Sequence, residues 1–127
     1  MTKKLKDISV LIVEDEPALN DAYATILRAE SITVDTSFDG AEALEKVGKN
    51  MPDIILLDLR MPNVDGLEFL RKFADVPNNR KAKVVIFSNF DEQEDIDKAF
   101  ALGAVRYMLK AWVSPKELVK LIKETAP

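Results

Sequence analysis

The chain has 127 residues, the length of one ordinary domain, and 47% of them are hydrophobic, which is enough for one core. It contains no cysteine and no histidine, and these absences exclude disulfides, thiol nucleophiles, thiolate zinc sites and imidazole catalysts. The 22 acidic and 18 basic residues give a net charge of −4, which argues against nucleic acid as a direct partner. The lysines near the N-terminus, Lys3, Lys4 and Lys6, are interpreted as a solvated tail.

Neither a membrane span nor a signal peptide is expected. No apolar run approaches the roughly 18 residues of a membrane span. The apolar run over residues 8–13 is short and leads into acidic residues 14–16, without a small-residue cleavage site. We therefore expect a cytoplasmic protein without membrane attachment, whose residues 1–127 form a single domain. The lack of cysteine fits a reducing compartment.

The first part of the chain predicts two strands and two helices. The dense aliphatic run over residues 8–13 lacks polar alternation, which is typical of a strand buried on both faces. A helix follows with Pro17 in its first turn, then a weaker strand pattern over residues 32–36, then a second helix with Asp39 as its cap. The apolar positions at helical spacing are Leu19, Ala22, Tyr23, Ile26 and Leu27 in the first helix and Ala41, Leu44 and Val47 in the second.

The rest of the chain repeats the strand–helix order three times. The predicted strands are residues 54–57, 84–87 and, with a weaker pattern, 105–109. The helices are marked by Leu67, Leu70 and Phe73, by Ile96, Ala99 and Phe100, and by Leu118, Leu121 and Ile122. Gly103 is suited to ending the fourth helix, because glycine adopts the left-handed conformation easily. The fifth helix is expected to begin at a capping box of Ser114 and Glu117, with Pro115 at its first position.

This order predicts an α/β fold of the (βα)5 type. Strand–helix–strand units make parallel strands with right-handed crossovers, so helices cover both faces of a doubly wound sheet. Ligands of such sheets bind beyond the carboxyl ends of the strands. Function is therefore expected in the residues that directly follow each strand.

Acidic, hydroxyl and amine side chains follow four of the five predicted strands. They are Glu14 and Asp15 after the first strand, Asp58 after the third, Ser88 after the fourth and Lys110 after the fifth. Each has an ordinary structural explanation, such as a helix cap, a turn residue or a solvated side chain. Their position at matching ends of parallel strands favours one shared site.

Carboxylates that lie close together repel one another unless a cation neutralises them. Mg²⁺ binds oxygen ligands and keeps several waters, so one or two carboxylates and a substrate phosphate would suit it. Lys110 would add a positive charge and Ser88 a hydroxyl donor, and such a site suits a phosphoryl group. Asp58 is the best candidate nucleophile, because it stands alone at its strand end.

These residues lie in segments that resemble a known family. The segments are Val10–Pro17, Asp53–Gly66, Val85–Ser88 and Gly103–Lys110, and the run from Asp58 to Gly66 is highly specific at this spacing. The sequence resembles the receiver domain of two-component response regulators, the CheY-like superfamily, over about Ile8 to Glu124. The resemblance implies a five-stranded parallel sheet in the order 2-1-3-4-5.

The resemblance also implies a role for each site residue. Asp58 would accept a phosphoryl group from a phosphohistidine on a histidine kinase or a histidine phosphotransfer protein. Asp15 and Asp58 would ligate Mg²⁺, with Glu14 acting through water and the carbonyl of Arg60 completing the protein ligands. Ser88 and Lys110 would bind the phosphoryl oxygens. The chain would catalyse its own phosphorylation and autodephosphorylation, and no reaction of an external substrate is expected.

Tyr107 matches the switch aromatic of the family, whose ring turns inward as the serine hydroxyl moves toward the phosphate. The alternative is a half-buried strand aromatic without a switching role. The fourth helix, fifth strand and fifth helix would form the output surface, which would bind an effector protein or a second copy of the chain.

The sequence departs from the family pattern in two loops. Ala111 follows Lys110 where the family has a proline after a cis bond, so we expect either a trans bond or a strained cis bond, since cis costs about 2.5–4 kcal/mol before a residue other than proline. Trp112 lies in a segment one residue longer than usual and would either cover the core or belong to a partner surface. Asn89 and Phe90 follow Ser88 where a small residue is usual. With Arg60 nearby, they predict slow autodephosphorylation.

Three alternative functions compete with that of a phosphorylated receiver. The altered loops would also fit a pseudo-receiver, an interaction module that does not cycle phosphate. A phosphatase with an aspartate nucleophile would need Asp-x-Asp after the first strand, where this chain has Glu14, Asp15 and Glu16. A flavin or dinucleotide carrier would need a glycine-rich first loop, and the chain has 4 glycines in all.

Overall fold

The computed structural model describes residues 7–61 and 63–126. The predicted lysine tail and residues 62 and 127 lie outside the described residues. The elements are β1 (Ser9–Val13), α1 (Pro17–Arg28), β2 (Thr33–Ser37), α2 (Gly40–Lys49), β3 (Ile54–Leu57), α3 (Gly66–Phe73), β4 (Lys83–Ser88), α4 (Gln93–Ala101), β5 (Arg106–Leu109) and α5 (Pro115–Thr125), with short 3₁₀ turns η2 (Asn79–Lys81) and η3 (Lys110–Trp112). The predicted alternation of strands and helices is confirmed.

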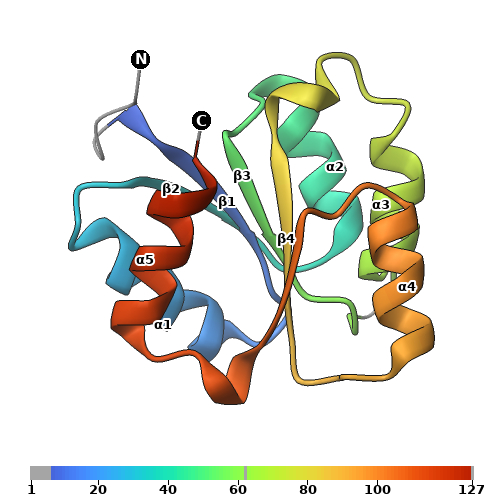
Figure 1. Cartoon of the computed structure of the whole chain (residues 1–127). Helices are drawn as coiled ribbons and strands as arrows, with labels where there is room; N and C mark the ends of the chain where they lie inside the picture. Colours follow the sequence, from blue (N-terminus) through green and yellow to red (C-terminus); the bar gives the residue numbers. More distant parts are fainter. Residues whose placement is uncertain (1–6, 62, 127) are drawn as a thin grey trace.

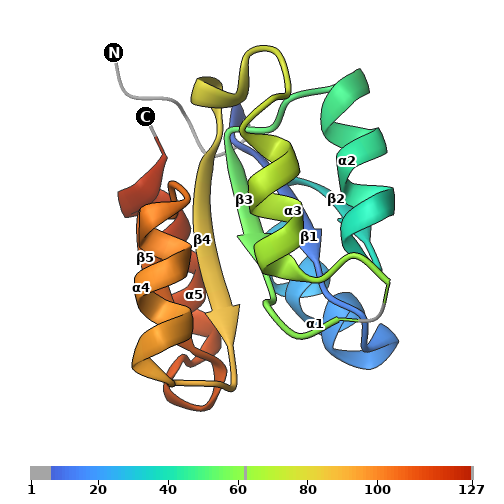
Figure 2. The same cartoon turned by 90° about the vertical axis from the view of Figure 1, so that its right-hand side faces the viewer.

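The strands form one parallel sheet in the order β2-β1-β3-β4-β5, as predicted. Helices α1 and α5 cover one face, and α2, α3 and α4 cover the other (Figures 1 and 2). All five strands run in the same direction, so their carboxyl ends meet at one edge of the molecule. This arrangement places the residues after β1, β3, β4 and β5 close together.

Burial along the strands explains why three of them were clearer in the sequence. β3 is buried throughout, and β1 and β4 are buried except at their first residues. β2 and β5 are the edge strands, and most of their residues are exposed or half-buried. An edge strand has less apolar surface to hide, so its hydrophobic pattern is weaker.

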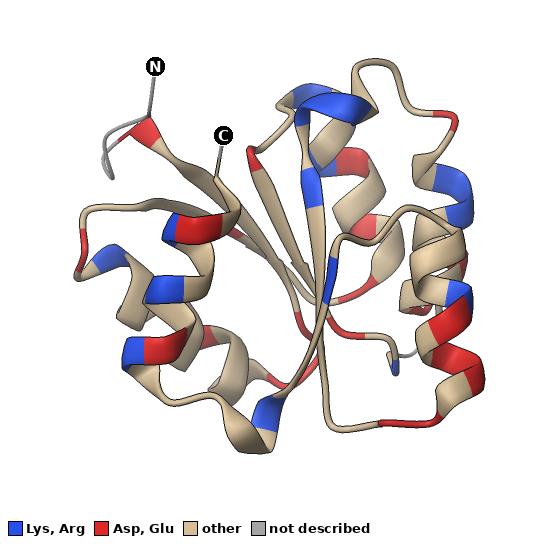
Figure 3. Cartoon of the chain, in the orientation of Figure 1, with Lys and Arg blue, Asp and Glu red and all other residues tan. Residues whose placement is uncertain are grey.

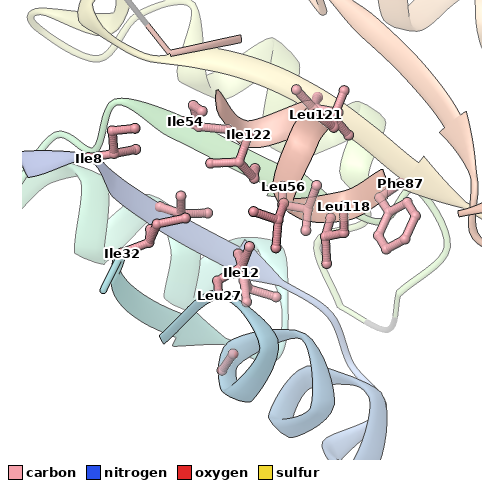
Figure 4. Close-up of a cluster of buried hydrophobic side chains, with 14 residues drawn as sticks. Ile8, Ile12, Leu27, Ile32, Ile54, Leu56, Phe87, Leu118, Leu121 and Ile122 are labelled. Atoms are coloured by element: carbon pink, nitrogen blue, oxygen red, sulfur yellow. The ribbon is translucent and has the colours of Figure 1, made fainter. Parts of the chain in front are cut away.

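A hydrophobic cluster lies on each face of the sheet. Figure 4 shows the one between the sheet and helices α1 and α5, where Leu27, Leu118 and Ile122 pack on Ile12 and Leu56. The other cluster joins the opposite face to α2, α3 and α4. Packing on both faces fixes β1 and β3, whose ends carry the acidic residues, in rigid positions.

The helix ends largely follow the predicted signals. Asp39 accepts a hydrogen bond from the Glu42 amide, and Ser114 and Glu117 form the expected capping box. Gly103 has a positive φ of 109° just after α4. Glu16 precedes α1 without a side-chain cap bond, so capping does not explain this acid. Within the described residues, no helix is long and apolar enough to cross a membrane.

Candidate functional site

Three acids come together at the carboxyl edge of the sheet, as the sequence predicted. Glu14 and Asp15 follow β1 and Asp58 follows β3. One carboxylate oxygen from each lies within 4.8 Å of the others. Glu14 and Asp58 are buried and Asp15 is half-buried. Three carboxylates so close together suit a hard divalent cation such as Mg²⁺.

Lys110 bridges two of these acids. Its Nζ donates to Asp58 Oδ2 at 2.9 Å and also to Glu14 Oε1. Burial acts to lower the pKa of Lys110, but the hydrogen bonds to the two carboxylates outweigh it and hold that pKa above its usual value. Burial raises the pKa of Glu14, and hydrogen bonds from Lys110 and the Glu16 amide offset this only in part. The raised pKa keeps Lys110 charged at neutral pH.

Main-chain and side-chain donors hold the acids in place. The Arg60 amide donates to Asp58 Oδ1 at 3.2 Å, and the Glu16 amide donates to Glu14 Oε2 at 3.1 Å. Asn20 is buried in α1, and its Nδ2 donates to the carbonyls of Glu14 and Ser37 at 3.0 Å each. Asn20 is not among the site residues that the sequence predicts. An amide on the apolar face of a predicted helix was the available signal, because a buried amide needs partners.

The turn after Asp58 depends on a glycine. A Cβ on Gly66 would lie 2.5 Å from the Asp58 carbonyl oxygen and 2.7 Å from Leu59 Cα, which no side chain tolerates. The absent side chain lets α3 begin directly against the end of β3. Asn63 adopts a positive φ of 61° in the same turn and donates to Asp39 at 3.2 Å. The turn is thereby tied to the start of α2.

The Arg60 side chain extends from this turn toward α4. Its Nη2 donates to Asp95 at 2.8 Å, and its guanidinium lies 4.7 Å from the centre of the Phe90 ring. Cation–π contact of this kind stabilises by about 0.5–1 kcal/mol at exposed sites. Arg60 thus joins the loop after β3 to the loop after β4. No contact of its carbonyl bears on the predicted metal role, which stays a prediction.

Ser88 and Tyr107 are linked through the main chain of Phe90. Ser88 ends β4 with its side chain buried, and its Oγ accepts a hydrogen bond from the Phe90 amide at 3.3 Å. The Tyr107 hydroxyl donates to the Phe90 carbonyl at 2.6 Å, and the ring is half-buried against the α4 side of the sheet. A path of two hydrogen bonds therefore joins the two predicted switch residues.

The loop after β5 contains the Lys110–Ala111 bond and Trp112, for each of which the sequence left two alternatives. The bond between Lys110 and Ala111 is trans, which is one of the two predicted forms. Trp112 is 75% exposed in η3, so the interpretation that it covers the core is wrong. Trp112 ends the short 3₁₀ turn η3, and its side chain lies at the surface.

The sequence and structure both match known proteins. Residues 10–123 match the family model of the response regulator receiver domain. The chain belongs to this family. Chemotaxis protein CheY of Treponema pallidum is 35% identical over 115 residues, covering 88% of this chain and 78% of that protein. The transcriptional regulatory protein CutR of Streptomyces coelicolor is 38% identical over 101 residues, which cover 80% of this chain. The chain spans 46% of CutR's length.

Solved receiver structures have the same fold. A CheY-like receiver domain protein from Methanospirillum hungatei superposes with a TM-score of 0.85 at 27% identity, covering 92% of this chain and 91% of that chain. Chemotaxis protein CheY4 of Vibrio cholerae gives 0.86 at 25% identity, covering 93% and 98%. The chain is thus a receiver domain of two-component response regulators, and such domains act with histidine kinases and effector domains.

Proposed function

We propose that the receiver domain is switched by phosphorylation of Asp58. A carboxylate oxygen of Asp58 attacks the phosphorus of a phosphohistidine on a partner protein. The bond between phosphorus and the imidazole nitrogen breaks, and its electron pair stays with that nitrogen. The chain has no histidine, so the donor is a histidine kinase, a phosphotransfer protein or a small phosphodonor.

The acidic residues fit a magnesium ion, because carboxylate oxygens are the ligands it prefers and three of them converge. Asp15 and Asp58 would hold the ion directly and Glu14 through water, with the Arg60 carbonyl as a further ligand. When bound, the ion would neutralise charge on the phosphoryl oxygens. Lys110 would contribute a second positive charge, and its contact with Asp58 at 2.9 Å supports this role.

Ser88 and Tyr107 would transmit the effect of phosphorylation at Asp58 to the protein surface. In this proposal the Ser88 hydroxyl turns to a phosphoryl oxygen and gives up its contact with the Phe90 amide, at 3.3 Å. The Phe90 main chain then shifts, and Tyr107 loses its partner there and turns inward. The face built by α4, β5 and α5 would change its binding to an effector.

Arg60 and Phe90 would slow the loss of the phosphoryl group. The two side chains lie against each other beside the site, with Phe90 41% exposed. An aromatic ring and a guanidinium at this point would hinder the water that hydrolyses phospho-Asp58. We therefore propose a long-lived phosphorylated state.

The convergence of Lys110 and three carboxylates carries the proposal, and phosphotransfer tests it. The chain would be incubated with a panel of phosphorylated histidine kinases, and label on the chain would be measured. Label should appear with at least one kinase, vanish in Asp58→Asn and persist in Asp75→Asn, whose aspartate is exposed after α3. Label that persists in Asp58→Asn would contradict the assignment.

A pseudo-receiver that binds partners without cycling phosphate is the competing function, motivated by the altered loops after Ser88 and Lys110. Beryllofluoride with Mg²⁺ imitates a phosphoryl group on aspartate and separates the two. A rise in Tm on its addition would support phosphorylation, and an unchanged Tm would favour the pseudo-receiver.

A further inference from the structure

The two edges of the sheet differ in how their outward main-chain groups are covered. On β2, the carbonyl of Val34 accepts from Arg28 Nη2 at 2.9 Å, and the carbonyl of Thr36 accepts from Lys46 Nζ. Arg28 lies in α1 and Lys46 in α2, so cationic side chains cover this edge from both faces. Covering of this kind prevents an edge strand from pairing with another chain.

The edge at β5 lacks such a cover in the part of the chain that the structure describes. The Lys83 amide at the start of β4 donates to the Asp53 carbonyl on the β3 side, so Val84 and Ile86 direct their main-chain groups the other way, to β5, and Ile86 pairs with Tyr107. In a parallel pair, the bonds of one residue go to the two neighbours of its partner. The main-chain amides of Tyr107 and Leu109 therefore face away from β4, and within the described residues no loop or turn hydrogen bond uses these two amides.

Two grooves flank this open edge. The larger, of about 520 Å³, lies on the α4 side and is lined mainly by apolar side chains, among them Ile96, Phe100, Leu109 and Trp112. The smaller, of about 180 Å³, lies on the α5 side between Met108 and the charged residues Glu117, Lys120 and Glu124. Side chains alternate between the two faces of a strand. A strand beside β5 would place apolar side chains in the larger groove and polar ones over the smaller.

Two aromatic side chains that line the larger groove are exposed. Trp112 is 75% exposed and Phe100 is 45% exposed. Phe100 follows the apolar spacing of α4, yet only Ala99 of that helix is fully buried. Large apolar side chains exposed together around a groove are typical of an interaction site.

Charge at the larger groove indicates what its partner carries. Residues 91–98 hold five acids and one lysine, so their excess of four negative charges equals the net charge of the whole chain, −4. Figure 3 shows these acids on α4 and in the turn before it. Glu94 and Asp95 have cationic partners within the domain, whereas Asp91 lines the groove. A basic residue on the partner would complement Asp91.

The same charge disfavours a second copy of the chain at this edge. A symmetric antiparallel pairing of β5 with β5 has its two-fold axis perpendicular to the sheet. That axis keeps like faces together, so α4 would lie beside α4 of the second copy. Two acidic helices would then repel each other.

We propose that β5 accepts an extended segment of a partner protein as a sixth strand. The segment has apolar residues at alternate positions, which enter the groove between α4 and β5, and a basic residue that meets Asp91. β5 has only four residues, so the groove supplies much of the affinity and the main chain fixes the register. This inference rests on the proposed output face and adds the form and chemistry of its partner.

The absence of cysteine from the chain allows a direct test. Val105 is exposed and directly precedes β5, so a Val105→Cys variant can hold a peptide beside this edge through one disulfide. The probe is a ten-residue peptide with valine and leucine at alternate positions and lysine and threonine between them, attached by either end so that both strand directions can form. The control peptide has proline at the positions whose amides would face β5, since proline has no N–H to donate.

The readout is the hydrogen exchange of the Tyr107 and Leu109 amides. The alternating peptide should slow both at least tenfold, whereas the proline peptide should not. Phe100→Ala and Trp112→Ala should weaken the effect, and Phe38→Ala, another exposed aromatic, should leave it unchanged. No slowing, or equal slowing by both peptides, overturns the proposal, as does protection of these amides by self-association without peptide. The test needs no phosphoryl group, so its failure leaves the phosphorylation of Asp58 standing.

Discussion

Replacing Lys110 with methionine removes the only charge that the structure places between Glu14 and Asp58 within the described residues. The side chains are 8% exposed for Lys110 and Asp58 and 3% for Glu14, so the pair is a buried one. Removing one partner of such a pair costs about 3–5 kcal/mol. We expect the lower end, about 3 kcal/mol without divalent cations, since the site lies at the open edge of the sheet. This corresponds to a fall in Tm of roughly 10 °C for a domain of this size.

Urea unfolding in EDTA measures the loss, and Lys49→Met is the matched control. Lys49 pairs with Glu45 on the exposed face of α2, where side chains 72% and 69% exposed predict an effect below about 0.5 kcal/mol. Saturating Mg²⁺ should reduce the difference in free energy of unfolding between wild type and Lys110→Met, because a divalent cation replaces the lost positive charge. If Lys110→Met lowers the free energy of unfolding by less than about 1 kcal/mol in EDTA, or if Mg²⁺ leaves the difference unchanged, Lys110 does not stabilise the fold by neutralising these carboxylates.

The stability lost in Lys110→Met should depend on pH. Burial holds the pKa of Glu14 in the folded state above its usual value. The protonated carboxyl therefore favours the folded state, and this contribution to stability is lost as the pH rises through the folded-state pKa. Without the hydrogen bond from Lys110, which acts to lower it, the pKa rises further. The stability gap should therefore shrink as the pH falls from 7 toward 4. A gap that is constant over this range would show that the carboxylates do not cause it.

Further predictions concern the turn, the loop and a cap. Gly66→Ala should destabilise by about 1–3 kcal/mol because its Cβ meets the Asp58 carbonyl, whereas Gly48→Ala in open space should stabilise by about 0.5 kcal/mol, both measured by urea unfolding. Phe90→Ala should shorten the lifetime of phospho-Asp58, measured as the rate at which label leaves the chain. An unchanged lifetime would show that Phe90 does not hinder hydrolysis. Ser114→Ala should cost about 1 kcal/mol by losing the capping box, visible as a lower urea midpoint.

The fold was predictable because its signals are local. Runs of buried aliphatic residues, helical spacing and caps such as Asp39 and Ser114 each depend on a few neighbouring residues. The parallel topology then placed Glu14, Asp15 and Asp58 at one edge. The coarse site followed from the order of the elements alone.

Individual side-chain contacts between segments far apart in the chain could not be predicted from the sequence. Lys110 reaches Glu14 across 96 residues, and Arg60 turns to Asp95 and Phe90 because those loops meet in the fold. The outward position of Trp112 likewise depends on how η3 leaves the sheet. Side-chain directions of this kind are decided by tertiary packing, which no local pattern encodes.

The central claim is that Asp58 carries the phosphoryl group, and chemical trapping tests it most directly. The chain would be incubated with Mg²⁺ and a small phosphodonor such as acetyl phosphate, then treated with borohydride, which reduces an aspartyl phosphate to homoserine. Mass spectrometry of the digested chain should find homoserine at position 58, and none when Mg²⁺ is withheld. Homoserine at another aspartate, or at none while a kinase still labels the chain, would contradict the account.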